Sequence, residues 1–307
     1  MQLGLVPVLV DVDPKTLAID LDSAKSVMSP NIRGMFLISI LGQPPNMSKY
    51  LEFCNEHKLI LLEDNCESLG AKHDGRYLGN FGAMSSFSFY FSHHISTIEG
   101  GMITTNDDAL ADDLRSARSH GWTRERRDAQ QWTDNYPALG SKFMFITPGY
   151  NVRPTEIQAA IGLCQLKKLD GFIESRRQLA RNIFSWIEES SSWLKIIGSE
   201  YLGYDNDHPD VHSWMTIPFV TNDDKPGAGQ KLMRFLDERG VECRPIIAGN
   251  IARQPATLEL SIKKASSLET SDKIFDQGFM IGCHADADPE SLKTLEAALK
   301  ELKGVSL

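Results

Sequence analysis

The chain has 307 residues, of which 41% are hydrophobic and 24% charged, a size and balance typical of a globular enzyme with one large and one smaller domain. Its formal net charge of −9 offers no general attraction to phosphate backbones, which excludes nucleic acid as an expected partner. No apolar run has the length of a membrane span, and the five dispersed cysteines form no CxxC pair, so we expect reduced thiols in a cytoplasmic protein.

Strand-like and helical segments alternate through the first part of the chain. Helical spacing is found at 46–57 and 107–119, and short apolar runs typical of strands are found at 6–12, 35–41, 59–62, 85–91 and 102–105. This alternation predicts βαβ units and a largely parallel sheet. Because ligands bind at the carboxyl ends of such strands, the polar residues that close the strands are the candidates for chemistry.

A second block follows a long helical stretch at 155–189, within which Gly171 can kink or divide the helix. Apolar runs at 214–220 and 241–247 predict strands, and the patterns at 229–240 and 289–303 predict helices. Polar stretches at 205–210 and 222–229 predict surface loops. We therefore predict a large cofactor-binding domain at 1–178 and a small α+β domain at 179–307.

Two motifs carry candidate chemistry. Asp64 ends the apolar run at 59–62, where a carboxylate either pairs with a cationic ring nitrogen or only caps the next turn. His93 and His94 follow the predicted strand at 85–91. Adjacent side chains on an extended segment point in opposite directions, so we expect no shared metal ion; the plainer interpretation is one packed and one solvated histidine.

Four segments in chain order resemble the DegT/DnrJ/EryC1/StrS family of nucleotide-sugar aminotransferases. They are 63–70 (EDNCESLG), 88–101 (SFYFSHHISTIEGG), 149–160 (GYNVRPTEIQAA) and 244–255 (RPIIAGNIARQP). The resemblance implies the α/β fold of type I pyridoxal-phosphate (PLP) enzymes, with a mainly parallel sheet, flanking helices and a small C-terminal α+β domain. It also implies a further N-terminal segment with a phosphate-binding cup, which has no counterpart before the run at 6–12, so we expect an N-terminally incomplete fold.

The family's cofactor contacts carry over to individual positions. The resemblance implies that Asp64 pairs with the pyridine nitrogen and that Glu67 approaches the ring, where glutamine is usual. It implies that Ser88 contacts the cofactor phosphate and that Asn151 reaches the phosphate of the neighbouring subunit, which predicts a homodimer. His93 stands where the family has the lysine that holds the cofactor covalently, and no lysine occurs from 83 to 106.

Histidine at this position and the EDNC segment resemble the sugar 3-dehydratase branch. Imidazole has no primary amine to bond the cofactor but moves protons near neutral pH, which favours the amine form, pyridoxamine phosphate (PMP). We expect C3 dehydration of a nucleotide-linked 4-keto-6-deoxyhexose in surface-polysaccharide synthesis, with His93 catalytic. Alternatives are a nucleotide-sugar aminotransferase and an inactive fragment or non-catalytic paralogue.

Substrate contacts and cofactor recycling are less constrained by the sequence. We expect His94 and Arg244 to bind substrate, since arginine binds carboxylates and phosphates through paired hydrogen bonds; a surface ion pair explains Arg244 equally well. In some family dehydratases glutamate restores PMP, and another type uses an iron–sulfur cluster and a reductase. The scattered cysteines argue against the second route, so we expect glutamate as amino donor.

Overall fold

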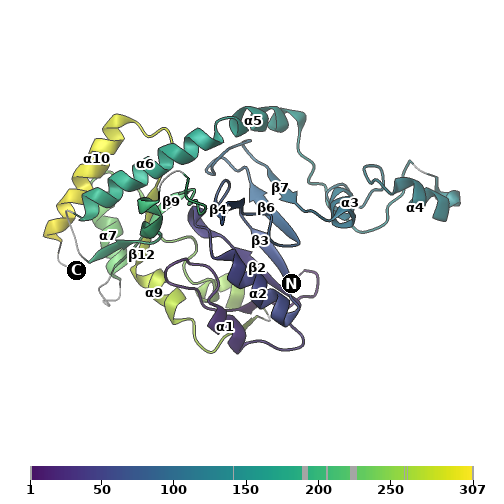
Figure 1. Ribbon diagram of the computed structural model, residues 1–307, viewed down its shortest axis with the longest axis horizontal. Helices are drawn as coiled ribbons and strands as arrows, with labels where there is room; N and C mark the ends of the chain where they lie inside the picture. Colours follow the sequence, from purple (N-terminus) through teal and green to yellow (C-terminus); the bar gives the residue numbers. More distant parts are fainter. Residues whose placement is uncertain are drawn as a thin grey trace.

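The computed structural model describes residues 2–140, 142–188, 193–204, 207–221, 227–258, 260 and 262–305. Two four-stranded sheets lie in separate parts of the molecule, and an arm extends away from both (Figure 1). The predicted loops at 205–210 and 222–229 lie partly outside the described residues. In the described part of the chain, no helix is both long and apolar enough to cross a bilayer.

The first sheet carries the strands predicted at 35–41, 59–62, 85–91 and 102–105. Its order is β2 (Gly34–Ile38), β3 (Ile60–Asp64), β6 (Met84–Ser88) and β7 (Gly101–Thr104). The β2–β3 and β3–β6 pairs are parallel, and β7 is antiparallel to β6. Side chains alternate along β2, with Met35 and Leu37 buried and Phe36 exposed. One face of this sheet therefore supplies the core.

Helix α2 (Met47–His57) contributes to the same core. Asn46 accepts the Lys49 N–H and caps its start, and Lys58 ends it in a left-handed conformation. Residues at helical spacing, Met47, Tyr50, Phe53 and Cys54, are buried. Short elements complete this part: α1 (Leu21–Ser26), the 3-10 turn η1 (Ile40–Gly42) and the hairpin β4 (Lys72–His73) and β5 (Arg76–Tyr77).

The second sheet is antiparallel, with the order β10 (Cys243–Arg244), β12 (Gly278–Gly282), β9 (Thr216–Thr221) and β8 (Leu194–Ile196). The helices of this part are α6 (Leu169–Glu188), α7 (Ala228–Asp237), α8 (Pro255–Leu258), α9 (Glu269–Gln277) and α10 (Pro289–Lys300). One hydrophobic cluster runs from Leu179 to Leu302. The sequence analysis predicted β9, β10, α7 and α10 and missed β8, β12 and α9.

The beginning of the chain packs against its C-terminal part. The strand predicted at 6–12 is only β1 (Val8–Leu9), and it pairs in parallel with β11 (Lys263–Lys264) instead of joining the first sheet. Asp11 accepts the backbone N–H groups of Thr270 and Ser271 at 2.9 and 2.8 Å. Helix α6 also runs across the predicted boundary at 178. The division into 1–178 and 179–307 stays a prediction. The β1–β11 pairing and the Asp11 hydrogen bonds join the two predicted domains, and α6 belongs to both.

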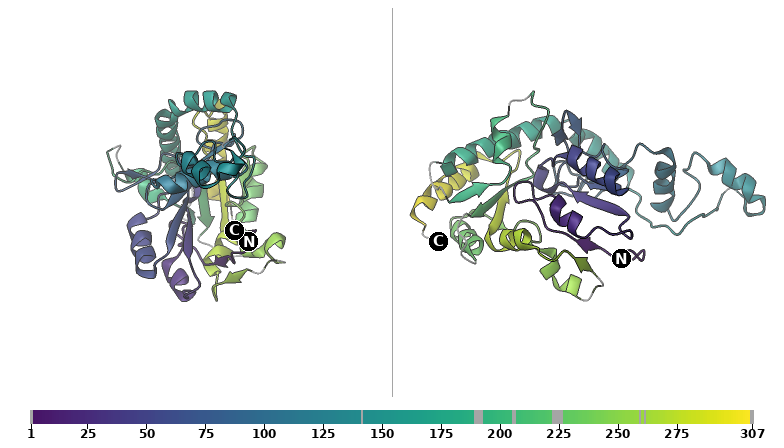
Figure 2. Two further views of the ribbon diagram at one scale, coloured as in Figure 1. Left: turned by 90° about the vertical axis from the view of Figure 1, so that its right-hand side faces the viewer. Right: turned by 60° about the horizontal axis from the view of Figure 1, so that its bottom comes forward.

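An arm formed by residues between α3 (Asp108–Ala117) and α5 (Glu156–Leu166) extends from the body and carries α4 (Ala129–Asn135), as Figures 1 and 2 show. The helical stretch predicted at 155–189 is divided between Leu166 and Leu169, so Gly171 lies inside α6 and not at the break. Apolar side chains on α5 are exposed, at Ile157, Leu163 and Leu166.

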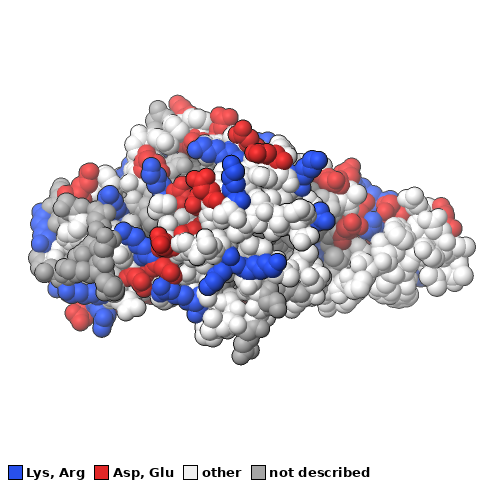
Figure 3. All heavy atoms as spheres, turned by 90° about the horizontal axis from the view of Figure 1, so that it is seen from below, with Lys and Arg blue, Asp and Glu red and all other residues white. Residues whose placement is uncertain are grey.

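Charges are mixed over the surface. On the face shown in Figure 3, acidic and basic side chains lie side by side over the body of the molecule. This face therefore carries no extended field of one sign, although the whole chain has a net charge of −9.

Candidate functional site

The carboxyl ends of β3 and β6 bring two predicted site residues to one edge of the first sheet. Asp64 is opposite Ser86 in the parallel register, and Ser88 lies two residues further along β6. The Cys66 N–H donates to Asp64 Oδ1 at 3.0 Å, and the Tyr90 N–H donates to Ser88 Oγ at 3.2 Å. Both polar side chains thus shape the turn after their own strand, and Asp64 does cap its turn as the plainer interpretation expected.

Glu67 follows the same strand as Asp64 and is half-buried. The Leu41 N–H donates to Glu67 Oε2 at 3.0 Å. Burial raises the pKa of Glu67, the Leu41 hydrogen bond opposes this, and the negative charge of Asp64 raises the pKa further. The charge of Asp64 is therefore felt at Glu67.

His93 lies within reach of the charge of Asp64. Burial lowers the pKa of His93, and the charge of Asp64 acts in the opposite direction. The ring contacts Tyr90 edge-on at 6.0 Å between centroids. Its Nδ1 is buried and has no hydrogen-bond partner among the described residues. A half-buried neutral imidazole with an unused ring nitrogen is suited to accept and return a proton.

His94 has the opposite surroundings. Its ring is 3% exposed, and Nε2 donates to the Ser213 carbonyl oxygen at 3.0 Å. Burial lowers the pKa of His94 to about 3, and the charge of Arg176 contributes. His94 thus has a protein partner, and direct substrate contact stays a prediction. Within the described ranges, no three His, Cys, Asp or Glu side chains converge as a metal site would require.

Asn151 and Arg244 lie apart from this group. Asn151 is exposed, forms an isolated bridge with Ser119 and accepts from the Arg153 guanidinium at 3.2 Å. Arg244 is exposed on β10 and pairs with Glu242 at 2.6 Å. In the part of the chain described, no hydrogen bond or ion pair joins either residue to Asp64. Their roles in binding the cofactor phosphate of the neighbouring subunit and the substrate therefore stay predictions.

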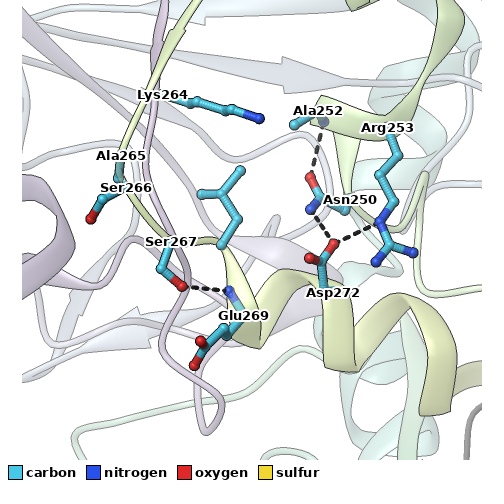
Figure 4. Close-up of a pocket in the computed structure, with 10 residues that line it drawn as sticks. Asn250, Ala252, Arg253, Lys264, Ala265, Ser266, Ser267, Glu269 and Asp272 are labelled. Carbon is cyan, nitrogen blue, oxygen red and sulfur yellow. Dashed lines mark hydrogen bonds and ion pairs between the residues drawn. The ribbon is translucent and has the colours of Figure 1, made fainter.

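The segment at 248–255 lines a separate hollow of about 360 Å³ between the turn η4 (Ile251–Arg253) and α9 (Figure 4). Asn250 Nδ2 and Arg253 Nε each donate to Asp272 Oδ1 at 2.7 Å, and the Ala252 N–H donates to Asn250 at 2.9 Å. These polar groups satisfy one another, so the segment is a structural connection between η4 and α9 in this conformation.

Two charged residues near the site had no role in the sequence analysis. Glu63, 2% exposed, accepts N–H groups from Gly79, Phe81 and Gly82 at 2.6–2.8 Å and so fixes the loop before β6. Arg176 on α6 is 5% exposed and donates to backbone carbonyls. An acid that ends a buried strand ahead of a Gly-rich loop was a usable signal for Glu63. Nothing in the sequence around Arg176 distinguishes it from an exposed helical arginine.

Comparison with known proteins identifies the family of this chain. The model of the DegT/DnrJ/EryC1/StrS aminotransferase family matches residues 1–300. The chain belongs to this family. A GDP-4-keto-6-deoxy-D-mannose 3-dehydratase from Yersinia pseudotuberculosis is 35% identical over 303 residues, which cover 98% of this chain and 75% of the relative.

Solved structures of relatives agree in fold. A GDP-4-keto-6-deoxymannose-3-dehydratase variant with bound GDP-perosamine has a TM-score of 0.85 and 32% identity, covering 97% of this chain and 76% of the other. The same kind of enzyme with a trapped PLP-glutamate geminal diamine has a TM-score of 0.82 and 31% identity, with the same coverage. The predicted fold class, a type I PLP-enzyme fold with a mainly parallel sheet and a smaller α+β part, is therefore confirmed.

Proposed function

We propose that this chain removes the C3 hydroxyl of a nucleotide-linked 4-keto-6-deoxyhexose, with PMP as cofactor, in the synthesis of surface-polysaccharide sugars. The observation that carries the proposal is the state of His93: a half-buried imidazole, with an unpartnered Nδ1, at the position of the family's lysine. The names of the 3-dehydratase relatives support the same reaction class.

The side chains at the sheet edge suit the ring of such a cofactor. Asp64 is an acid that a ring N–H can approach, and the unused His93 Nδ1 lies in the field of that acid. Ser88 ends the neighbouring strand and has a hydroxyl that can still donate to a phosphate oxygen, because in this structure it only accepts. When bound, PMP supplies a primary amine for a keto group and a ring that withdraws electrons.

Each residue then has a defined task. Asp64 keeps the ring nitrogen protonated by charge pairing. His93 would take up at Nδ1 the proton that leaves the amine-bearing carbon of the bound cofactor, and would pass it to the departing C3 hydroxyl, which leaves as water. Glu67, whose pKa is raised by burial, holds a hydrogen bond to the backbone and closes the ring site on one side. Asn151 and Arg244 act on ligands shared with a second subunit.

The proposed partners follow from the exposed apolar surface and from the relatives. Apolar side chains on α5 and the arm, among them Ile157, Leu163 and Phe143, support a homodimer in which a second copy covers them. Glutamate is proposed as the amino donor that restores PMP, and the cytoplasm as the location, where nucleotide sugars are made.

The test combines cofactor retention and product analysis. The purified chain is titrated with PMP, desalted and given a GDP- or dTDP-linked 4-keto-6-deoxyhexose. We expect retained PMP absorbance and a 3-deoxy-4-keto product lighter by one oxygen atom, because PMP supplies the electrons that replace the C3 hydroxyl by hydrogen. An amino-sugar product would instead identify an aminotransferase, and loss of PMP on desalting would identify a non-catalytic chain.

Two substitutions at one position then test the role of His93. We expect His93→Ala to lose dehydration by about three orders of magnitude while PMP is still bound, because only the proton carrier is removed. His93→Lys is expected to gain covalent cofactor attachment, seen as a shifted absorbance band, and to lose dehydration. Unchanged dehydration in His93→Ala would overturn the assignment.

A further inference from the structure

Two backbone segments that are far apart in the sequence meet beneath the site. The Ser213 N–H donates to the Gly42 carbonyl at 2.9 Å, and the Met215 N–H donates to the Leu41 carbonyl at 3.0 Å. A Cβ on Gly42 would lie 2.5 Å from the Trp214 nitrogen, so this approach requires glycine. The turn 213–215 belongs to the C-terminal part, and 41–42 belongs to the part that carries Asp64 and His93.

Both segments contain a strained residue. Leu41 has φ 56° and Trp214 has φ 47°, a left-handed conformation that bulky side chains rarely adopt. Such conformations cost on the order of 1–3 kcal/mol each and persist only where the surroundings enforce them. Strained positions of this kind cluster at functional sites, so what enforces the strain here is informative.

Arg176 binds the strained turn at 213–215 from the side of α6. Its NH1 donates to the Trp214 carbonyl at 3.2 Å, to the Met215 carbonyl at 2.9 Å and to the Cys283 carbonyl. The side chain is 5% exposed, and no carboxylate pairs with it among the described residues. The guanidinium supplies hydrogen bonds to three buried carbonyls and thereby joins the turn at 213–215 to the backbone of Cys283.

The turn at 213–215 reaches the site by two hydrogen bonds. On one side, the Ser213 carbonyl accepts from His94 Nε2 at 3.0 Å, and His94 directly follows His93 in the chain. On the other side, Leu41 is held by Met215, and its own N–H donates to Glu67 at 3.0 Å. One turn therefore fixes the neighbours of both the proton carrier and the buried acid.

We propose that Arg176 is a positioning residue for this site: by holding the Trp214–Met215 turn, it sets His94 and Leu41, and through them the orientation of His93 and Glu67. His94 then acts as a hydrogen-bond donor to the Ser213 carbonyl and not as a substrate ligand. The proposal rests on the proposed function for the identity of the reaction. The hydrogen bonds from which it is argued are observed in this structure whatever the reaction is.

The first experiment compares Arg176→Met with Arg181→Met in the PMP-loaded full chain. Arg181 is the matched control, since it lies on the same helix and bonds to the Leu202 and Tyr204 carbonyls at 3.4 and 3.3 Å, away from the turn. The readout is the ¹⁵N-histidine spectrum, in which a protected Nε2–H reports the His94–Ser213 bond. We expect this signal to disappear in Arg176→Met and to remain in Arg181→Met.

Kinetics give a second, independent readout. A displaced catalytic group lowers kcat, so we expect Arg176→Met to lose about a hundredfold in kcat with KM for the sugar little changed. Arg176→Lys retains the charge and part of the hydrogen bonding, and we expect partial recovery of both the spectrum and kcat. An intact His94 signal with unchanged kcat in Arg176→Met, or an equal loss in Arg181→Met, overturns the proposal.

A pair of substitutions at His94 tests the same link if Arg176→Met does not fold. Glutamine places an amide donor near the position of Nε2, and asparagine places one near Nδ1. Donation to Ser213 predicts that His94→Gln retains more kcat than His94→Asn, by about tenfold. The reverse order overturns the proposal. If the wild-type chain yields no dehydrated sugar, the proposed function fails, while the histidine spectra of the Arg176 variants still decide this inference.

Discussion

The backbone N–H of Leu41 donates to the Glu67 carboxylate at 3.0 Å, which ties a strained turn after β2 to an acid after β3. Burial raises the pKa of this acid, so its charged form is disfavoured in the folded chain. The bond needs only an acceptor, which glutamine also provides. Charge and hydrogen bonding at this position can therefore be separated by substitution.

Glu67→Gln is expected to retain the fold and to gain stability relative to wild type as pH rises. Below the ordinary Glu pKa of 4.5, Glu67 of wild type is protonated in both the folded and the unfolded chain. The stability of wild type is lost as pH rises through the raised pKa of Glu67 in the folded chain. Urea unfolding at several pH values from mildly acidic to mildly basic checks this. Glu56→Gln, on the exposed side of α2, is the matched control for the change from carboxyl to amide.

Asp64→Asn should separate the structural and chemical roles of that residue. The asparagine oxygen still accepts the Cys66 N–H, so we expect little change in melting temperature. Loss of the negative charge should lower dehydration by about two orders of magnitude. It should also lower the pKa of His93 further, because Asp64 acts to raise it. An NMR titration of His93 that moves upward would contradict this assignment.

Two buried histidines should make the chain sensitive to acid. Burial lowers the pKa of His94 to about 3 and that of His212 well below its ordinary value of 6.5. Their contribution to stability is present above pH 6.5 and is lost as pH falls towards the folded values, by about 1.4 kcal/mol per pH unit for each histidine. Unfolding free energies measured by urea between about pH 6.5 and pH 4 test this slope.

His212→Asn provides the control for that titration. The asparagine oxygen still accepts the Trp214 N–H, which His212 Nδ1 accepts at 2.9 Å, but it does not titrate. We expect the unfolding free energy of His212→Asn to depend less steeply on pH than that of wild type, because one of the two buried histidines no longer titrates. Equal slopes would mean that His212 is charged in the folded chain.

Asp11→Ala should loosen the contact between the start of the chain and α9. The Asp11 carboxylate accepts from Thr270 N, Ser271 N and Ser271 Oγ at 2.7–2.9 Å. Although burial alone raises the pKa of Asp11, these hydrogen bonds hold it below its usual range. Removing them is expected to cost about 2–3 kcal/mol of unfolding free energy. Asp11→Asn, which keeps one acceptor oxygen, should lose less unfolding free energy. An equal loss would argue against a role of the Asp11 hydrogen bonds in holding the start of α9.

Much of the first sheet and of the site edge could be predicted from the sequence. Apolar runs that end in polar residues mark buried parallel strands, so β3 with Asp64 and β6 with Ser88 were placed correctly. The short strand β1 was expected in the parallel sheet, but it pairs with β11. An apolar run does not specify which strand it pairs with. Strands β8 and β12 and helix α9 were missed because each is too short for a clear period of apolar residues. Their side chains are buried by contacts with segments distant in the sequence.

By itself, the sequence determined the chemistry available at the site: a histidine at 93, no lysine from 83 to 106, and acids at 64 and 67. Such covalent facts do not depend on folding. Only the tertiary structure decided that Arg176 binds the Trp214 carbonyl, that Leu41 is paired with Met215, and that His94 has a backbone carbonyl as its partner. Backbone carbonyls and N–H groups occur at nearly every residue, so no residue pattern marks which of them a distant side chain will bind.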